Sequence, residues 1–129
     1  YNCFTYYLWH ESRWLDIVDD AVALIEKETT PSGEIFGDSG TVPLFALRSG
    51  KRIAGNEVDT NIQRYKSGNA DPDKLIRTID SPKTEMIILR YRFGITALPQ
   101  VQRLVTEKYK MLKDLRTTGG EVFLFYKRK

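Results

Sequence analysis

The chain has 129 residues, which is enough for one domain with a single hydrophobic core. Hydrophobic residues make up 41% of it and charged residues 29%, a balance that excludes a disordered chain and is typical of a soluble globular protein. Its net charge of +3 comes from 20 basic and 17 acidic residues mixed through most of the sequence, so we expect no nucleic-acid partner.

The first fourteen residues are unusually aromatic, with six such side chains: Tyr1, Phe4, Tyr6, Tyr7, Trp9 and Trp14. Tyrosine and tryptophan favour the membrane–water boundary, and they also pack helices onto a domain. Both interpretations stay open. We expect residues 1–14 to be a lead-in from an upstream membrane helix, with a candidate membrane-surface contact, and residues 15–129 to form one soluble α/β domain. No apolar run of about 18 residues occurs, so no span is expected within the chain.

The first half of that domain predicts two helices and two strands. An amphipathic helix carries Trp14, Val18, Ala21 and Ile25 at three- and four-residue spacing, and the turn at residues 29–33 ends it. Residues 34–36 form a short buried strand. A helix follows near Pro43 and ends at Gly50, since proline suits a first helical turn and glycine a helix end. Residues 52–54 form a second strand.

The second half begins with a helix carrying Ile62 and Tyr65, which ends at Gly68. Another helix starts at Asp71-Pro72, a cap followed by proline at the first helical position. Residues 85–91 are apolar at consecutive positions, so we expect a strand covered on both faces. A helix begins near Pro99, and residues 110–116 and 121–127 form a hairpin across a glycine turn. The predicted fold is a three-layer α/β sandwich with a mostly parallel central sheet and a C-terminal antiparallel hairpin.

Two polar loops are candidate ligand sites, because ligands of α/β sheets bind outside the carboxyl ends of the strands. The candidate residues are Asp38, Ser39 and Gly40 after the first strand, and Asp59, Thr60, Asn61 and Arg64 after the second. If the two strands are parallel neighbours, both loops lie at one edge, and Arg64 is available for a phosphate. The alternative interpretation is structural: the first loop is a strand-to-helix turn, and Asp59 is a helix cap.

The inventory of catalytic side chains is small. Cys3 and His10 are the chain's only cysteine and histidine, which excludes an internal disulfide and a cysteine-rich metal site. His10 lies in the aromatic lead-in, away from the strand ends, so a serine–histidine triad is not expected. We therefore expect no catalytic residue, no metal ligand and no cofactor. The basic tail, residues 127–129, is either a solvated end or a contact to a membrane or polyanion.

The ordered segments also resemble a known family. These segments are IEKETTPSGEIFGDSGTVPLFALRSGKRIAGNEVDTNIQRYKSG, then MIILRYRFGI, and then KMLKDLRTTGGEVFLFYKRK. Together they resemble the C-terminal soluble region that follows the last membrane helix in prokaryotic, often archaeal, relatives of the protein mannosyltransferases and aminoarabinose transferases. Those multi-span enzymes use polyisoprenyl-phosphate sugars, and their catalytic acidic residues lie between membrane helices that this sequence lacks.

The resemblance implies a non-catalytic domain on the extracytoplasmic side of a membrane-bound glycosyltransferase, where it helps to shape acceptor access. The implied partners are the membrane-embedded part of the same chain and a glycan or protein acceptor. Two other functions stay open. The chain could be a free-standing α/β module that binds a nucleotide or phosphorylated ligand, or it could be a protein-interaction domain.

Overall fold

A computed structural model describes residues 17–38, 41–56, 65–91 and 94–129. Its centre is a five-stranded sheet with the order β2-β1-β3-β5-β4. The strands are β1 (Glu34–Gly37), β2 (Arg52–Ile53), β3 (Thr84–Arg90), β4 (Tyr109–Arg116) and β5 (Val122–Arg128). The predicted α/β class is therefore confirmed.

The pairing of the strands makes the sheet mixed. β1 pairs in parallel with both β2 and β3, whereas β3 pairs antiparallel with β5, and β5 with β4. The predicted antiparallel hairpin is present, but the prediction of a mostly parallel sheet is only partly matched. The reason is that the hairpin joins the sheet through β5 and contributes two full-length strands, while β2 has only two residues.

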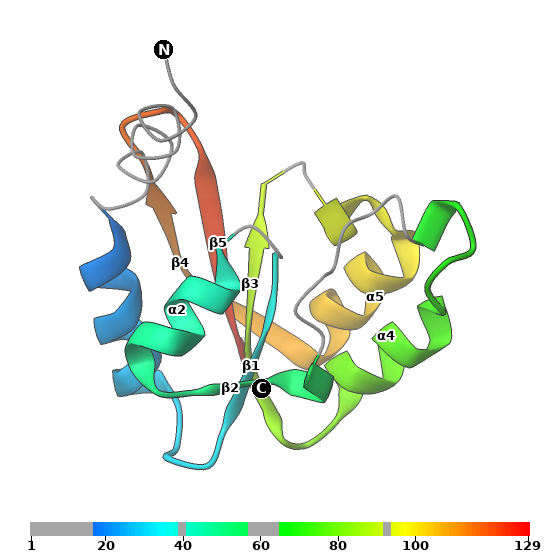
Figure 1. The fold of residues 1–129 in the computed structure, drawn as a ribbon, viewed down its shortest axis with the longest axis horizontal. Coiled ribbons are helices and arrows are strands. Elements are labelled where there is room, and N and C mark those ends of the chain that lie inside the picture. The colour runs from blue at the N-terminus through cyan, green and yellow to red at the C-terminus, as the bar shows by residue number, and fades with distance from the viewer. Residues whose placement is uncertain (1–16, 39–40, 57–64, 92–93) are drawn as a thin grey trace, which may run out of the picture.

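Helices cover both faces of this sheet. Figure 1 shows the helix at residues 17–28 and α2 (Val42–Ser49) on one side, with α4 (Pro72–Asp80) and α5 (Pro99–Lys108) on the other. Two hydrophobic clusters correspond to these faces. The first cluster contains Val18, Ala21, Ile25, Ile35, Phe45, Met86, Ile88, Phe123 and Phe125, among others. The second contains Phe36, Leu75, Ile79, Ile87, Leu89, Val101, Val105 and Tyr109, among others.

β3 shows why the sequence produces this arrangement. Its side chains alternate between the two clusters, with Met86 and Ile88 in the first and Ile87 and Leu89 in the second. Successive side chains of a strand point to opposite faces, so a continuous apolar run requires cover on both sides. All four side chains are buried, which confirms the prediction for this strand.

The helix ends follow their local signals. Asp71 accepts a hydrogen bond from the backbone N–H of Asp73 at 2.9 Å, as expected of a cap that precedes proline. Gly50 ends α2 with φ of 72°, a left-handed conformation that glycine adopts without strain. Two short 3₁₀ helices are also present, η1 (Ala54–Asn56) and η2 (Gly94–Ala97), and neither was predicted. Residues 65–66 are helical, and the rest of the helix predicted to carry Ile62 and Tyr65 lies outside the described residues.

Candidate functional sites

The structure describes only part of the sheet edge where we predicted a ligand site. The pairing of β1 with β2 in parallel register confirms that these strands are parallel neighbours, so the residues that follow them leave from the same edge of the sheet. Of the candidate residues, Asp38 is described. The other candidates, Ser39, Gly40, Asp59, Thr60, Asn61 and Arg64, lie outside the described residues.

Asp38 connects three elements at this edge. Its backbone N–H donates to the Ile88 carbonyl at 3.0 Å, and its own carbonyl accepts from the Val42 N–H at 2.9 Å, where α2 begins. Its carboxylate accepts from the Thr41 hydroxyl at 3.2 Å. The same carboxylate lies beside η2, since a Cβ placed on Gly94 would be 3.4 Å from Asp38 Oδ1. Asp38 therefore takes part in the local strand-to-helix turn.

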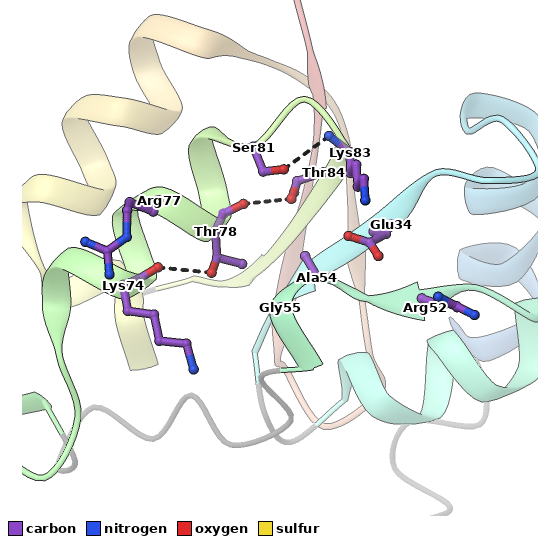
Figure 2. Close-up of a pocket in the computed structure, with 10 residues that line it drawn as sticks. All are labelled: Glu34, Arg52, Ala54, Gly55, Lys74, Arg77, Thr78, Ser81, Lys83 and Thr84. Carbon is purple, nitrogen blue, oxygen red and sulfur yellow. Dashed lines mark hydrogen bonds between the residues drawn. The ribbon is translucent and has the colours of Figure 1, made fainter.

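A second candidate site lies near the opposite ends of the strands, where β1 and β3 begin. A hollow of about 390 Å³ opens there between α4 and the start of β2. Its lining consists of Glu34, Arg52, Ala54, Gly55, Lys74, Arg77, Thr78, Ser81, Lys83 and Thr84, which we call the basic pocket. Figure 2 shows Lys74 and Arg77 projecting from α4 on one side of it and Arg52 on the other.

Buried residues form the inner part of the basic pocket. Ala54 and Thr84 are fully buried, and Thr78 is nearly so. The Thr84 hydroxyl donates to the Thr78 carbonyl at 2.7 Å, and the Thr78 hydroxyl donates to the Lys74 carbonyl at 3.0 Å. Gly55 contacts this inner part closely, because a Cβ there would lie 3.0 Å from Thr78 Oγ1. These contacts join α4 to η1 and to β3 at the base of the pocket.

Arg128 stabilises the C-terminal end of α4 beside this pocket. Its guanidinium donates to the carbonyls of Ile79 at 3.0 Å, Ser81 at 2.6 Å and Thr84 at 3.1 Å. A cation at this position complements the negative end of the helix dipole. This residue of the basic tail is thus half-buried and bonded within the domain, and neither sequence interpretation of the tail anticipated that role.

Tyr109 belongs to the same network. Its hydroxyl donates to the Ile79 carbonyl at 2.6 Å and accepts from Arg128 at 3.2 Å. Burial raises the pKa of Tyr109 to about 12, although the neighbouring Arg128 charge acts in the opposite direction. The side chain therefore stays protonated at neutral pH and serves as a hydrogen-bond donor.

A second hollow of about 400 Å³ adjoins the C-terminal tail and the turn after the first helix. Glu85 accepts from the Thr30 backbone N–H at 2.7 Å and from the Thr30 hydroxyl at 2.8 Å. Lys127 pairs with Glu28 at 3.1 Å. These contacts hold the turn at Thr30 against β3 and the tail against the first helix.

Sequence reasoning missed the basic pocket because its cations are far apart along the chain. One local signal was available: Lys74 and Arg77 are three residues apart on α4 and so share one helix face. Arg52 and Lys83 reach the same hollow only through the pairing of β2, β1 and β3. That pairing is a long-range contact, and no local pattern specifies it.

Fold and pocket together define a three-layer α/β domain with a cationic hollow beside its sheet. No protein-family model matches the chain, and neither a curated protein nor a solved structure is significantly similar to it. Among the described residues, no helix has both the length and the apolarity needed to cross a bilayer. In the same part of the chain, no group of three or more histidine, cysteine, aspartate or glutamate side chains is placed to hold a metal ion.

Proposed function

We propose that this chain is a non-catalytic α/β domain of a membrane-bound glycosyltransferase that uses polyisoprenyl-phosphate sugar donors. On this proposal it lies on the extracytoplasmic side, next to the membrane-embedded part of the same protein. There it shapes the access of a glycan or protein acceptor. The observation that carries the proposal is the ordered series of segments that resembles the soluble C-terminal region of those enzymes.

The fold supports treating these segments as one unit. The first segment supplies β1 and β2, the second supplies most of β3, and the third supplies most of β4 and all of β5. They are separated in sequence but form adjacent strands of one sheet, in the order β2-β1-β3-β5-β4. A resemblance that includes every strand concerns the whole folded domain, whereas a chance match to turns and caps would involve isolated loops.

The polar interactions described above are of the kind that an accessory domain needs. Glu85 binds the turn at Thr30, and Arg128 and Tyr109 bind backbone groups at the end of α4. Each of these side chains connects elements that are distant in sequence. Their role is to hold a stable scaffold on which loops can face a neighbouring part of the protein.

The test begins with the gene. The reading frame upstream of Tyr1 should encode roughly ten or more apolar segments of about 20 residues each. Full-length protein should then sediment with membranes and transfer sugar from a polyisoprenyl-phosphate donor to its acceptor. Deletion of residues 15–129 from it should reduce transfer to the acceptor without abolishing membrane insertion.

The isolated chain serves as the matched control. Because the proposal places the catalytic residues outside it, it should neither hydrolyse nor transfer a polyisoprenyl-phosphate sugar. Turnover by the isolated chain would overturn the non-catalytic role. An upstream frame without apolar segments would overturn the membrane enzyme and would favour a free-standing module.

A further inference from the structure

The basic pocket is the more positively charged of the two hollows described above. Its lining contains four basic residues, Arg52, Lys74, Arg77 and Lys83, and one acidic residue, Glu34. The lining thus carries a formal charge of +3, which equals the net charge of all 129 residues. The second hollow, lined by four basic and two acidic residues, has a formal charge of +2, and both of its acidic side chains accept hydrogen bonds within it.

Three of these cations are available to a ligand. Arg52, Arg77 and Lys83 are exposed, and none of them makes a side-chain hydrogen bond or ion pair with the residues that the structure describes. Elsewhere in the domain, Lys127 pairs with Glu28 and Arg48 pairs with Asp19. Exposed cations such as Arg103 and Lys113 have no described partner either, but they line neither hollow. Unpaired cations gathered around one hollow raise the local concentration of anions there.

The hydroxyl groups of the pocket also fall into two kinds, those that donate within the fold and one that has no described acceptor. Thr78 and Thr84 donate to backbone carbonyls and are committed to the fold. Ser81 accepts from the Lys83 backbone N–H at 3.3 Å, and the described residues provide no acceptor for its own hydrogen. The Ser81 hydroxyl can therefore donate to a bound oxygen. Its position at the end of α4 places it beside Lys83.

The end of a helix normally repels an anion, because the free carbonyls there carry partial negative charge. In this domain Arg128 donates to the carbonyls of both Ile79 and Ser81, at 3.0 and 2.6 Å. The guanidinium compensates that charge from the side of β5. These two carbonyls therefore oppose an anion in the adjacent pocket less than free carbonyls would.

We propose that the basic pocket binds the phosphate group of a small phosphorylated ligand. One arginine guanidinium can bind two phosphate oxygens at once. Arg52 and Arg77 line opposite sides of the hollow, and Figure 2 shows their guanidinium groups projecting away from each other, so they offer separate contacts to a ligand. Lys83 and the Ser81 hydroxyl supply further donors. The volume of about 390 Å³ lies within the range of small-molecule sites and exceeds what one phosphate group occupies, so a polar body such as a sugar accompanies the phosphate.

The experiment uses the 129-residue chain, labelled with ¹⁵N and titrated in low salt with glucose 6-phosphate, inorganic pyrophosphate and unphosphorylated glucose. The two phosphorylated probes should shift the amides of residues 52–55, 77–78 and 81–84, and glucose should not. The double variant Arg52→Gln/Arg77→Gln should weaken binding by at least about tenfold, since it removes two charge-assisted contacts. Binding should also weaken as salt is raised.

A matched control removes the same charge elsewhere. Arg103→Gln/Lys113→Gln changes exposed cations on α5 and β4 and should leave the affinity for either probe within about twofold, since neither residue lines the basic pocket. All four substitutions are at exposed positions, so the variants should fold. Equal weakening by both double variants would show non-specific charge attraction and would overturn the proposal, as would the absence of shifts with every phosphorylated probe.

A second arm identifies the source of the phosphate. Vesicles of phosphatidylcholine with and without phosphatidic acid are mixed with the chain and with both double variants. Pocket-dependent binding to phosphatidic acid vesicles, with none to soluble probes, assigns the phosphate to a lipid headgroup. Binding of soluble probes alone assigns it to a free metabolite. Binding in neither arm overturns the site but leaves the proposed glycosyltransferase role intact, because that role rests on other residues and is tested by deletion.

Discussion

Arg128 lies over the aromatic ring of Tyr109, with its guanidinium carbon 5.0 Å from the ring centroid. The two side chains also share a hydrogen bond of 3.2 Å, and both bind the carbonyl of Ile79. The last strand is thereby joined to the end of α4 and to the first residue of β4. The pair thus links α4 to the two strands of the hairpin, and we expect it to contribute to the stability of the fold.

The first prediction concerns stability at high pH. An unfolded tyrosine titrates near pH 10, whereas burial raises the pKa of Tyr109 in the folded domain to about 12. The unfolded state therefore loses its proton first as the pH rises. The stabilisation is complete below pH 10 and is lost as the pH rises through about 12, by roughly 2–3 kcal/mol in total. Urea unfolding at a series of pH values measures this loss.

Tyr109→Phe is the control for that measurement. The variant loses the hydrogen bond to Ile79 and should be less stable at neutral pH by about 1–2 kcal/mol. Its stability should fall less steeply above pH 10, because one titrating group has been removed. A decline identical to that of the parent chain would mean that Tyr109 does not cause it.

A second prediction separates two adjacent residues of the basic tail. Arg128→Ala removes hydrogen bonds to three carbonyls and the contact with Tyr109, and should cost about 2–4 kcal/mol. Lys129→Ala removes one exposed bond of 3.3 Å and should cost less than about 0.5 kcal/mol. Both costs come from urea midpoints. Similar costs for the two variants would show that Arg128 behaves as a solvated end.

The sequence predicted those parts of the fold that local chemistry determines. Asp71-Pro72 and Pro99 marked helix starts, Gly50 marked a helix end, and the run at residues 85–91 indicated a strand covered on both faces. Local signals did not predict which strand of the sheet the C-terminal hairpin pairs with. The pairing of β5 with β3 depends on contacts such as Ile88 with Phe125, between residues far apart in sequence. That insertion is what makes the sheet mixed.

One of the two candidate sites could be predicted from the sequence, and the other depends on long-range contacts. The position of Asp38 at the ends of β1 and β3 followed from the order of the elements and the topology rule for α/β sheets. The basic pocket instead joins Arg52 with residues of α4 and with Lys83, and the role of Arg128 depends on carbonyls 47 and 49 residues earlier. Periodicity and capping signals reach only a few residues along the chain, so they contain no information on such contacts.

A third prediction concerns the centre of the sheet. Ile88 is fully buried in the first cluster and pairs with Gly37 on one side and Phe125 on the other. Ile88→Ala leaves a cavity that neighbouring strands cannot fill, and should cost about 2–5 kcal/mol. Ile88→Val, which removes one methylene group, should cost only about 0.5–1.5 kcal/mol. Thermal or urea unfolding that shows no difference between the two would contradict this position in the core.

The last prediction tests the close contact between β1 and β3 at the ligand edge. Gly37 has φ of 150°, and a Cβ there would lie 1.8 Å from the Ile88 carbonyl oxygen, which is backbone and cannot rotate away. Gly37→Ala must therefore push the two strands apart, and should cost more than about 3 kcal/mol. Gly50→Ala is the matched control, because Gly50 also has positive φ, 72°, but a Cβ there meets nothing within 4 Å.

That control should cost only about 1–2 kcal/mol, the strain of a left-handed residue with a Cβ. The comparison thus separates steric contact from backbone conformation, and urea unfolding measures both variants. Asp38 follows Gly37 and donates to the same Ile88 carbonyl, so displacement of this oxygen should also shift the amide resonances of Asp38 and Val42 in Gly37→Ala. Equal costs for the two variants, with unchanged resonances at Asp38, would show that β1 and β3 do not meet at this distance.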